Sequence, residues 1–259
     1  MLTTSIIVER RDSFAVVRLN RPEKLNALSD ELLSELSESF SELAKDENLR
    51  AVILTGNGSA FSSGTDLGQL ADANEPNAKS VAHHGKAVCD QIDKFSVPVI
   101  AAVNGIAAGG GCELVLACHL RIATREAQFS LPEIKLGVIA AYGGTQRLAN
   151  EIGRARALEM MLTGRALSAD EALRFGLINE VAESEQLMTR AELLATEIAQ
   201  LAPLAVRACI HAVTKGLELP MTEALELETE LFAKLFASRD MREGTRAFLE
   251  KRKAVFNGT

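Results

Sequence analysis

Two short apolar runs constrain the fold of this 259-residue chain more than any other feature. The runs are Ala51–Thr55 (AVILT) and Pro98–Val103 (PVIAAV), and each stops at a glycine-containing turn, Gly56-Asn57-Gly58 or Asn104-Gly105. Strands that are apolar on both faces are typical of buried, parallel sheets. The two runs therefore predict buried strands, and the first is expected to lie in a parallel sheet.

Further strands and helices alternate along the first half of the chain. An amphipathic helix with an apolar face, capped by Ser29 or Asp30, is predicted from Leu32, Leu33, Leu36, Phe40 and Leu43. The other predictions are strands over Ser5–Glu9, Phe14–Leu19 and Leu120–Thr124 and a buried helix over Cys112–Cys118. This alternation is typical of α/β architecture. By contrast, the polar composition of residues 70–80 predicts a mobile loop.

The second half of the chain is predicted to be mostly helical from about residue 143. Ser168-Ala169-Asp170-Glu171 has the pattern of a capping box at a helix start, and Gly176 suits the end of that helix. After residue 186 the sequence predicts amphipathic helices that break at Pro203 and Pro220.

Charge and aromatic content argue against several classes of partner. The formal net charge of −7 disfavours general binding to nucleic acid or to an anionic membrane. Ten Phe, one Tyr and no Trp are few for a surface that stacks bases or sugars. No apolar run approaches the ~20 residues that span a bilayer, and Met1–Ser5 has no signal-peptide pattern. We expect a cytoplasmic protein that binds neither nucleic acid nor membrane.

The cysteines and histidines do not form a metal-binding pattern. Cys89, Cys112, Cys118 and Cys209 contain no C-x-x-C pair, and no two histidines have H-x-x-x-H spacing. The cysteines are interpreted as buried free thiols in a reducing compartment, and no metal site is expected.

Three segments are candidates for chemistry: Phe61–Leu67 (FSSGTDL), Asn104–Glu113 (NGIAAGGGCE) and 131–148. None contains a Walker phosphate loop, a G-x-G-x-x-G between a strand and a helix, or a G-x-S-x-G nucleophile elbow. Glycine clusters alone also arise from tight packing of a helix on a strand.

Two glutamates in these segments have alternative interpretations. Glu113 enters the predicted buried helix at its first turn, where the helix N-terminus favours a carboxylate. It could equally be a catalytic acid or base beside free N–H groups that hold developing negative charge. Glu133 follows Pro132 and is either catalytic or paired with a nearby cation. The candidate cations are Arg121, Arg125 and Lys135. Taken singly, each glutamate favours the structural interpretation.

Together and in this order, the three segments resemble the enoyl-CoA hydratase/isomerase (crotonase) family, especially its bacterial short-chain enoyl-CoA hydratases. RPEKLNAL, TGRALSADEALRFGLINEV and EGTRAFLEKRKAVF are also similar to that family, so the resemblance spans nearly the whole chain. It implies an α/β fold: a superhelix of ββα units over residues 1–195, holding an acyl-CoA site. Residues 196–259 would form a C-terminal helical region that drives trimerisation, and two trimers commonly stack into a hexamer.

The resemblance also implies the chemistry. The substrate is an acyl-CoA thioester, so coenzyme A is part of the substrate and no separate cofactor is expected. The backbone N–H groups of Thr65 and Gly110 are expected to form an oxyanion hole. Glu113 is expected to activate water and Glu133 to donate a proton to Cα, giving reversible syn hydration of a 2-trans-enoyl-CoA. The pair is expected to titrate as a coupled unit.

The remaining site residues are also taken from the resemblance. Phe232 and Lys251 are expected to close the site, from the same or a neighbouring subunit. The residues expected to line the substrate are Lys24, Leu25, Ala27, Ser63, Gly64, Asp66, Leu67 and Ala141.

One segment departs from the family pattern I-P-G-[AG]-G-G-T-Q-R-L. The chain has Ile139-Ala140-Ala141-Tyr142-Gly143-Gly144-Thr145. Ala141 replaces a glycine whose N–H lies near the catalytic water, and Tyr142 is the only tyrosine. The change either serves packing or reshapes the acyl pocket, and the sequence favours neither.

Two other functions stay open. One is a different crotonase-family reaction, such as enoyl-CoA isomerisation or hydration of a branched or aromatic-pathway acyl-CoA. The other is binding of acyl-CoA or RNA without turnover, against which the acidic charge and scarce aromatics weigh. Because both glutamates are present, hydration is favoured.

Overall fold

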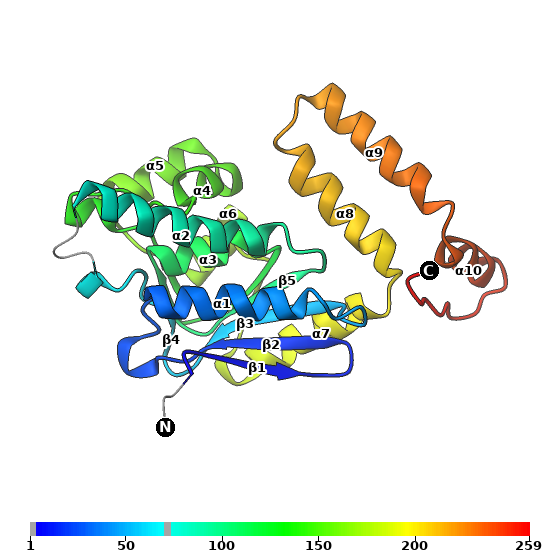
Figure 1. The fold of residues 1–259 in the computed structure, drawn as a ribbon, viewed down its shortest axis with the longest axis horizontal. Helices are drawn as coiled ribbons and strands as arrows, with labels where there is room; N and C mark the ends of the chain where they lie inside the picture. Colours follow the sequence, from blue (N-terminus) through cyan, green and yellow to red (C-terminus); the bar gives the residue numbers. More distant parts are fainter. Residues whose placement is uncertain (1–3, 70–73) are drawn as a thin grey trace.

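A six-stranded sheet forms the centre of the molecule in the computed structural model, which describes residues 4–69 and 74–259 (Figure 1). Its strands, in spatial order, are β1 (Ile6–Arg10), β2 (Phe14–Leu19), β3 (Ala51–Gly56), β5 (Val99–Val103), β7 (Leu120–Thr124) and β10 (Glu180–Ala182). The β1–β2 pair is antiparallel, and every other neighbouring pair is parallel. The predicted strands are confirmed to within a residue or so at each end, and β3 and β5 are buried along their whole length.

A second, four-stranded sheet alternates with the first along the chain. It contains β4 (Ala60–Ser62), β6 (Ile106–Ala108), β8 (Gln128–Ser130) and β9 (Leu167–Ser168). A strand of each sheet and then a helix make one unit, and this unit recurs as β3-β4-α2, β5-β6-α3 and β7-β8-α4. The predicted α/β fold of ββα units is confirmed.

Helices α1 (Asp30–Leu43), α2 (Glu75–Asp93), α3 (Gly110–Ala117) and α4 (Gly144–Ile152) pack side by side as a layer. Ser29 caps α1, accepting a hydrogen bond from the N–H of Leu32, and all five predicted apolar positions of α1 are buried. Phe40 of α1 packs edge-on against Phe95, with ring centroids 5.1 Å apart. The main core lies between this layer and the two sheets.

The prediction of a mobile loop over residues 70–80 is wrong for residues 74–80. Helix α2 begins at Glu75, where the side chain of Asn74 accepts a hydrogen bond from the N–H of Asn77 and Pro76 occupies the first turn. These first turns are exposed, so polar composition here reflects a solvent-facing helix. Residues 70–73 lie outside the described residues.

The second half is helical, as predicted. It contains α5 (Arg154–Thr163), α6 (Ala169–Phe175), α7 (Leu187–Ala199), α8 (Pro203–Gly216), α9 (Met221–Leu235) and α10 (Arg239–Leu249). The capping box at Ser168 and the left-handed Gly176 at the end of α6 are both confirmed. The breaks at Pro203 and Pro220 are confirmed too, since these residues start α8 and precede α9.

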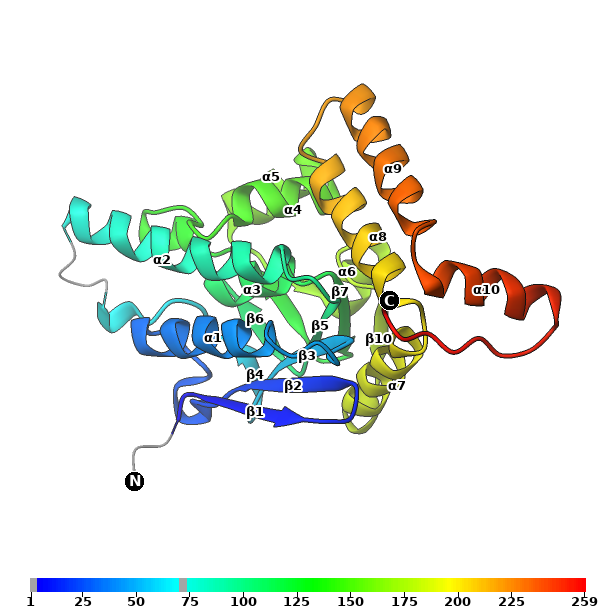
Figure 2. The ribbon, with the colours of Figure 1, turned by 45° about the vertical axis from the view of Figure 1, so that its right-hand side comes forward.

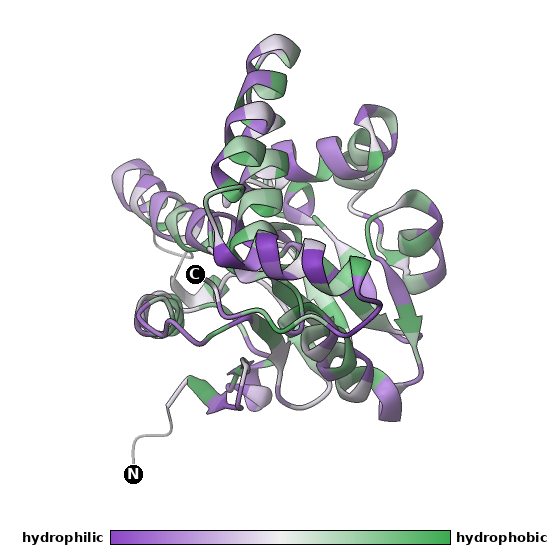
Figure 3. Cartoon of the chain, turned by 90° about the vertical axis from the view of Figure 1, so that its right-hand side faces the viewer, coloured by the Kyte–Doolittle hydropathy of each residue, from purple (hydrophilic) through white to green (hydrophobic). Residues whose placement is uncertain are grey.

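Helix α7 and the last three helices differ in their packing. Leu187, Ala191 and Ala195 of α7 are buried against the sheet face opposite α1–α4. Helices α8, α9 and α10 extend away from the two sheets (Figures 1 and 2). Hydrophobic residues lie along these outer helices as well as in the core (Figure 3). Phe232 is 62% exposed and Phe248 is 83% exposed, so these helices leave large apolar side chains uncovered.

In the part of the chain that the structure describes, no single helix is long and apolar enough to cross a membrane. The helices over Ser184–Ala199 and Pro203–Gly216 reach that length and hydropathy only as a pair, which is bent by 109° at its break.

The cysteines are free thiols, and three of them, Cys89, Cys112 and Cys118, are buried. The expectation of burial is wrong for Cys209, which is exposed because it lies on α8, outside the main core.

Truncation of Phe40 tests the packing between α1 and the core. We expect Phe40→Ala to lower the free energy of unfolding by about 3–5 kcal/mol, because a buried aromatic leaves a cavity that the surroundings only partly fill. Urea denaturation at fixed protein concentration measures this. Leu193→Ala, at a position that is 55% exposed, is the control and should change it by less than about 0.5 kcal/mol. Equal losses in the two variants would contradict the assignment of the core.

Candidate active site

Three neighbouring strands of the small sheet place the candidate site. Strand β4 leads into Gly64 and Thr65, β6 leads into Gly109 and Gly110, and β8 leads into Glu133. Because β4, β6 and β8 pair in parallel, their carboxyl ends meet at one edge of the sheet. The sheet thus brings together segments that are far apart in the sequence.

A close backbone approach at Gly64 joins the first two segments. Gly64 has φ +97°, and a Cβ atom there would lie 2.7 Å from the carbonyl oxygen of Ala108 and 3.3 Å from the backbone nitrogen of Gly110. A side chain would therefore clash, and the positive φ also favours glycine.

The N–H of Thr65 remains outside the local backbone pairing. Leu28 bridges this segment, with its N–H donating to the carbonyl oxygen of Gly64 (2.8 Å) and its own carbonyl accepting from the N–H of Asp66 (3.0 Å). These bonds use the groups on either side of Thr65, and within the described residues its own N–H donates to no backbone group and is available to a substrate.

The N–H of Gly110 is available for a different reason. Gly110 is the first residue of α3, so its N–H lies outside the hydrogen bonds within the helix. Gly109, with φ +51°, turns the chain into the helix. The start of a helix carries partial positive charge. The structure therefore brings the Thr65 and Gly110 segments together, as expected for an oxyanion hole.

Glu113 is buried, with 2% of its surface exposed, and its carboxylate is held by a distant segment. Oε1 accepts hydrogen bonds from the N–H groups of Tyr142 (2.7 Å) and Gly144 (2.6 Å). Burial raises the pKa of Glu113 to about 7, with a further rise from the charge of Glu133. The backbone bonds, including one from Ala141, oppose that rise. The carboxyl can therefore exchange protons near neutral pH.

Glu133 lies beside the same helix start. It begins the 3-10 helix η3 (Glu133–Leu136), and a Cβ atom on Gly109 would lie 2.9 Å from its Oε1. Oε2 is buried and has no hydrogen-bond partner among the described residues. Burial raises the pKa of Glu133. A buried oxygen without a protein partner is suited to contact a substrate or water.

Glu133 does not form the ion pair that the sequence left open. Within residues 4–69 and 74–259 it has no salt bridge. Arg121 pairs instead with Glu151 (2.8 Å) and Arg125 with Glu183 (2.9 Å), and Lys135 forms no salt bridge with any described residue.

Ala141 and Tyr142 belong to the third segment, whose backbone N–H groups bind the carboxylate of Glu113. Ala141 does not have a positive φ, so its methyl group is accommodated without backbone strain. Tyr142 is 3% exposed, and its phenol oxygen accepts a hydrogen bond from the hydroxyl of Thr65 (3.0 Å). Burial raises the pKa of Tyr142 to about 12, so the phenol stays neutral.

Arg147 supports this segment from behind, and the sequence reasoning missed it. Its Nη1 donates to the carbonyl oxygen of Tyr142 (3.0 Å), and its Nη2 pairs with Asp90 (2.6 Å) and Asp93 (3.5 Å) of α2. The only signal was its place in the motif GGTQRL.

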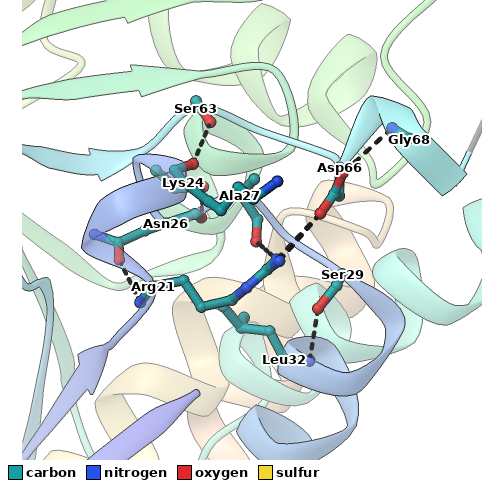
Figure 4. Close-up of polar contacts among 10 residues, drawn as sticks. Arg21, Lys24, Asn26, Ala27, Ser29, Leu32, Ser63, Asp66 and Gly68 are labelled. Carbon is teal, nitrogen blue, oxygen red and sulfur yellow. Dashed lines mark hydrogen bonds and ion pairs between the residues drawn. The ribbon is translucent and has the colours of Figure 1, made fainter. Parts of the chain in front are cut away.

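Asn26, also missed, shapes the loop before α1 (Figure 4). It is fully buried and left-handed, with φ 55°. Its side chain accepts from the N–H of Arg21 (2.9 Å) and donates to the carbonyls of Asn57 (2.9 Å) and Ala60 (2.8 Å). An asparagine in a loop is common, so nothing in the sequence around Asn26 indicates that its side chain binds three backbone groups.

Arg21 joins the two stretches predicted to line the substrate. Its guanidinium donates to the carbonyl of Ala27 (2.7 Å) and pairs with Asp66 (3.2 Å), as Figure 4 shows. This ion pair connects the loop before α1 to the segment that carries Thr65.

The other predicted lining residues of these stretches are also close together. The N–H of Ser63 donates to the carbonyl of Leu25 (2.9 Å), and the Ser63 hydroxyl donates to that of Lys24 (3.4 Å). Leu25 and Leu67 are 42% and 54% exposed, so they lie at the rim of the site.

Phe232 and Lys251 are not brought to this site within one chain. Phe232 is on α9, where it packs against Phe236 with ring centroids 5.0 Å apart, and Lys251 follows α10. Both helices lie apart from α3 in Figures 1 and 2.

In the described ranges no three His, Cys, Asp or Glu side chains are grouped so that they could hold a metal ion.

Comparison with known proteins shows the family to which the chain belongs. Residues 9–259 match the sequence profile of the family described as enoyl-CoA hydratase/isomerase. The short-chain-enoyl-CoA hydratase of Clostridium acetobutylicum is 39% identical over 254 residues, which cover 98% of this chain and 97% of the relative. The crotonyl-CoA hydratase of Syntrophomonas wolfei is 37% identical over 257 residues, covering 99% of each. The crystal structure of enoyl-CoA hydratase from Bacillus anthracis has a TM-score of 0.95 and 37% identity, covering 98% of this chain and 100% of that one.

The raised pKa of Glu113 predicts a pH-dependent stability effect. Between the ordinary carboxyl pKa of 4.5 and the folded value of about 7, the folded protein binds more protons than the unfolded chain, so its stability falls as pH rises. Glu113→Gln removes this contribution. We therefore expect the melting temperature of the variant, relative to the parent, to rise from pH 4.5 to pH 7 and then level off.

Thermal melts across pH 4–8 measure that difference. Glu47→Gln, at an exposed position, is the control and should show no such trend. A difference for Glu113→Gln that stays constant over this range would contradict the assignment.

Proposed function

Because the chain belongs to the enoyl-CoA hydratase/isomerase family, we propose that it is an enzyme that adds water reversibly to a 2-trans-enoyl-CoA, giving a 3-hydroxyacyl-CoA. The observation that carries this conclusion is a pair of carboxyls, the buried Glu113 and the half-buried Glu133, beside the backbone N–H groups of Thr65 and Gly110. Moving a double bond needs one acid/base group, whereas adding water needs a group for each of two protons.

The two N–H groups bind the thioester oxygen. When a proton is added at Cα, the thioester passes through an enolate-like state with negative charge on this oxygen. Thr65 and Gly110 donate to that oxygen, and the start of α3 adds partial positive charge. One such donor typically stabilises the transition state by about 2.7–4 kcal/mol.

The hydrogen bonds around the carboxyls support different roles for them. Glu113 accepts two backbone hydrogen bonds, which favour its ionised form. It takes a proton from water as the water oxygen adds to Cβ. Glu133 has a buried oxygen without a partner among the described residues, and burial raises its pKa, so it can carry the proton that it gives to Cα. Dehydration uses the same groups in reverse.

The coenzyme A portion lies along the rim formed by Lys24, Leu25 and Ala27 with Ser63–Leu67, largely through backbone groups, and Ala141 faces the acyl end. Coenzyme A enters as part of the substrate, and no further cofactor takes part. Three buried thiols are compatible with a reducing cytoplasm, where we place the enzyme.

The exposed helices support an oligomer. We infer that residues 1–195 form the catalytic body and that residues 196–259 associate between copies, giving a trimer or a hexamer. The exposed side chains of Phe232 and Phe248 would be buried in the interface between copies. Phe232 and Lys251 could then complete the site of a neighbouring copy.

Replacement of either glutamate tests the reaction. With crotonyl-CoA as substrate, we expect Glu113→Gln and Glu133→Gln each to lower kcat/KM at least ~100-fold, because each removes one proton-transfer group. Loss of the enoyl-thioester absorbance measures the rate. Glu47→Gln is the matched control and should keep the parental rate. Full activity in both active-site variants would refute the proposed function.

The mass of the intact protein tests the association of the outer helices. Light scattering during gel filtration should give three or six copies of the 27.8 kDa chain. We expect Phe232→Asp to shift this mass towards the single chain, because a charge would be buried in the interface. A single-chain mass for the parent protein would contradict the proposal.

A further inference from the structure

The ring of Tyr142 fills the space between two helices next to the proposed oxyanion hole. A Cβ atom on Gly85 of α2 would overlap the ring, and one on Gly110 of α3 would lie 2.8 Å from its Cε2. Tyr142 fits only because both neighbouring positions are glycine. The hydroxyl of Thr65 also donates a hydrogen bond to the phenol oxygen (3.0 Å), which fixes the far end of the ring.

The backbone of Tyr142 is also held in place, by hydrogen bonds at both its N–H and its carbonyl. The N–H of Tyr142 donates to Glu113 (2.7 Å), and its carbonyl accepts from Arg147 (3.0 Å). Arg147 is in turn paired with Asp90 of α2 (2.6 Å). The backbone bonds fix the position from which the ring projects, and rotation of the ring out of the site would break its bond to Thr65. The ring of Tyr142 is therefore held in place.

The proposed reaction sets the path of the acyl chain relative to this ring. The thioester oxygen lies at the N–H groups of Thr65 and Gly110, and Cβ lies where Glu113 can deliver water. Tyr142 contacts all three of these residues through its ring, hydroxyl or N–H. Tyr142 therefore borders the proposed positions of both the thioester oxygen and Cβ, and its ring is the nearby bulky group that the next carbon of the acyl chain can meet.

We propose that Tyr142 is a specificity-determining residue, whose ring ends the acyl site after the fourth carbon and restricts the enzyme to short-chain enoyl-CoA. This inference rests on the proposed function and adds the substrate class and the residue that sets it. In an apolar site, one methylene group changes discrimination by about 10- to 200-fold. Chains of six or eight carbons should thus be strongly disfavoured.

A chain-length panel tests this inference. The substrates are 2-trans-enoyl-CoA thioesters with four, six and eight acyl carbons, and the quantity is the eight-to-four ratio of kcat/KM. We expect the parent ratio to be far below one and Tyr142→Ala to raise it at least about tenfold, as expected when at least one methylene is newly accommodated. Tyr142→Leu, a milder truncation, should raise it in the same direction and serves if the alanine variant does not fold.

Two control variants separate the ring from other effects. Tyr142→Phe keeps the ring and removes the hydroxyl, so its ratio should stay within about twofold of the parent. Phe95→Ala truncates a buried aromatic at the far end of α2 and tests general loosening, so its ratio should also be unchanged. An unchanged ratio in both truncations, or an equal shift in Tyr142→Phe or Phe95→Ala, would overturn the inference.

Binding of saturated thioesters separates this inference from the proposed function. Calorimetry compares the dissociation constants of butyryl-CoA and octanoyl-CoA for the parent and Tyr142→Ala. If no enoyl-CoA is hydrated, the proposed function fails. The inference about Tyr142 is then supported if Tyr142→Ala binds octanoyl-CoA more tightly than the parent does while its affinity for butyryl-CoA is unchanged. It is overturned if the affinity for octanoyl-CoA does not increase.

Discussion

The hydrogen bonds from the backbone of Tyr142 and Gly144 to Glu113 are the contacts on which the rest of the site depends. A buried carboxylate without donors would be strongly destabilising, and these bonds supply donors from the segment that precedes α4. They also define the conformation of that segment. Gly143 has φ +109°, and a Cβ atom on Gly144 would lie 2.8 Å from Cγ of Glu113. The same contacts therefore hold the Glu113 carboxyl in place and determine how α3 packs against α4.

The small sheet supplies the other half of the site. Its strands β4, β6 and β8 have only three residues each, yet each one ends where a functional segment begins. Successive ββα units place these ends side by side, so two backbone donors and one carboxyl come from three different units. The large sheet and its core fix the spacing of the units, and the functional residues are carried on the short connections.

The contrast between the large buried sheet and the short strands that carry the site explains which features the sequence could predict. The buried strands β3 and β5 were readable because each is a short apolar run that ends at a glycine-containing turn. Three-residue strands have no detectable period, so the small sheet and the meeting of Thr65, Gly110 and Glu133 were expected only from family resemblance. The start of α2 was misread because its first turns face solvent and look like a loop. Asn26 binds the backbone of Asn57 and Ala60, and Arg147 pairs with the side chains of Asp90 and Asp93. These partners are distant in sequence, so the contacts leave no local pattern.

The departure at Ala141 and Tyr142 is accounted for by residues elsewhere in the fold. Ala141 avoids a positive φ, so a residue with a methyl group is tolerated where the family pattern has glycine. The ring of Tyr142 needs space, and Gly85 of α2 provides it by having no side chain. The motif shows neither the φ of Ala141 nor the contact with Gly85, which lies outside the family signatures. Gly85 is in the middle of a helix, where glycine is unfavourable by about 0.5–1 kcal/mol relative to alanine. The burial of the Tyr142 ring, which is 3% exposed, offsets this cost, so Gly85 and Tyr142 form one packing unit between α2 and the segment before α4.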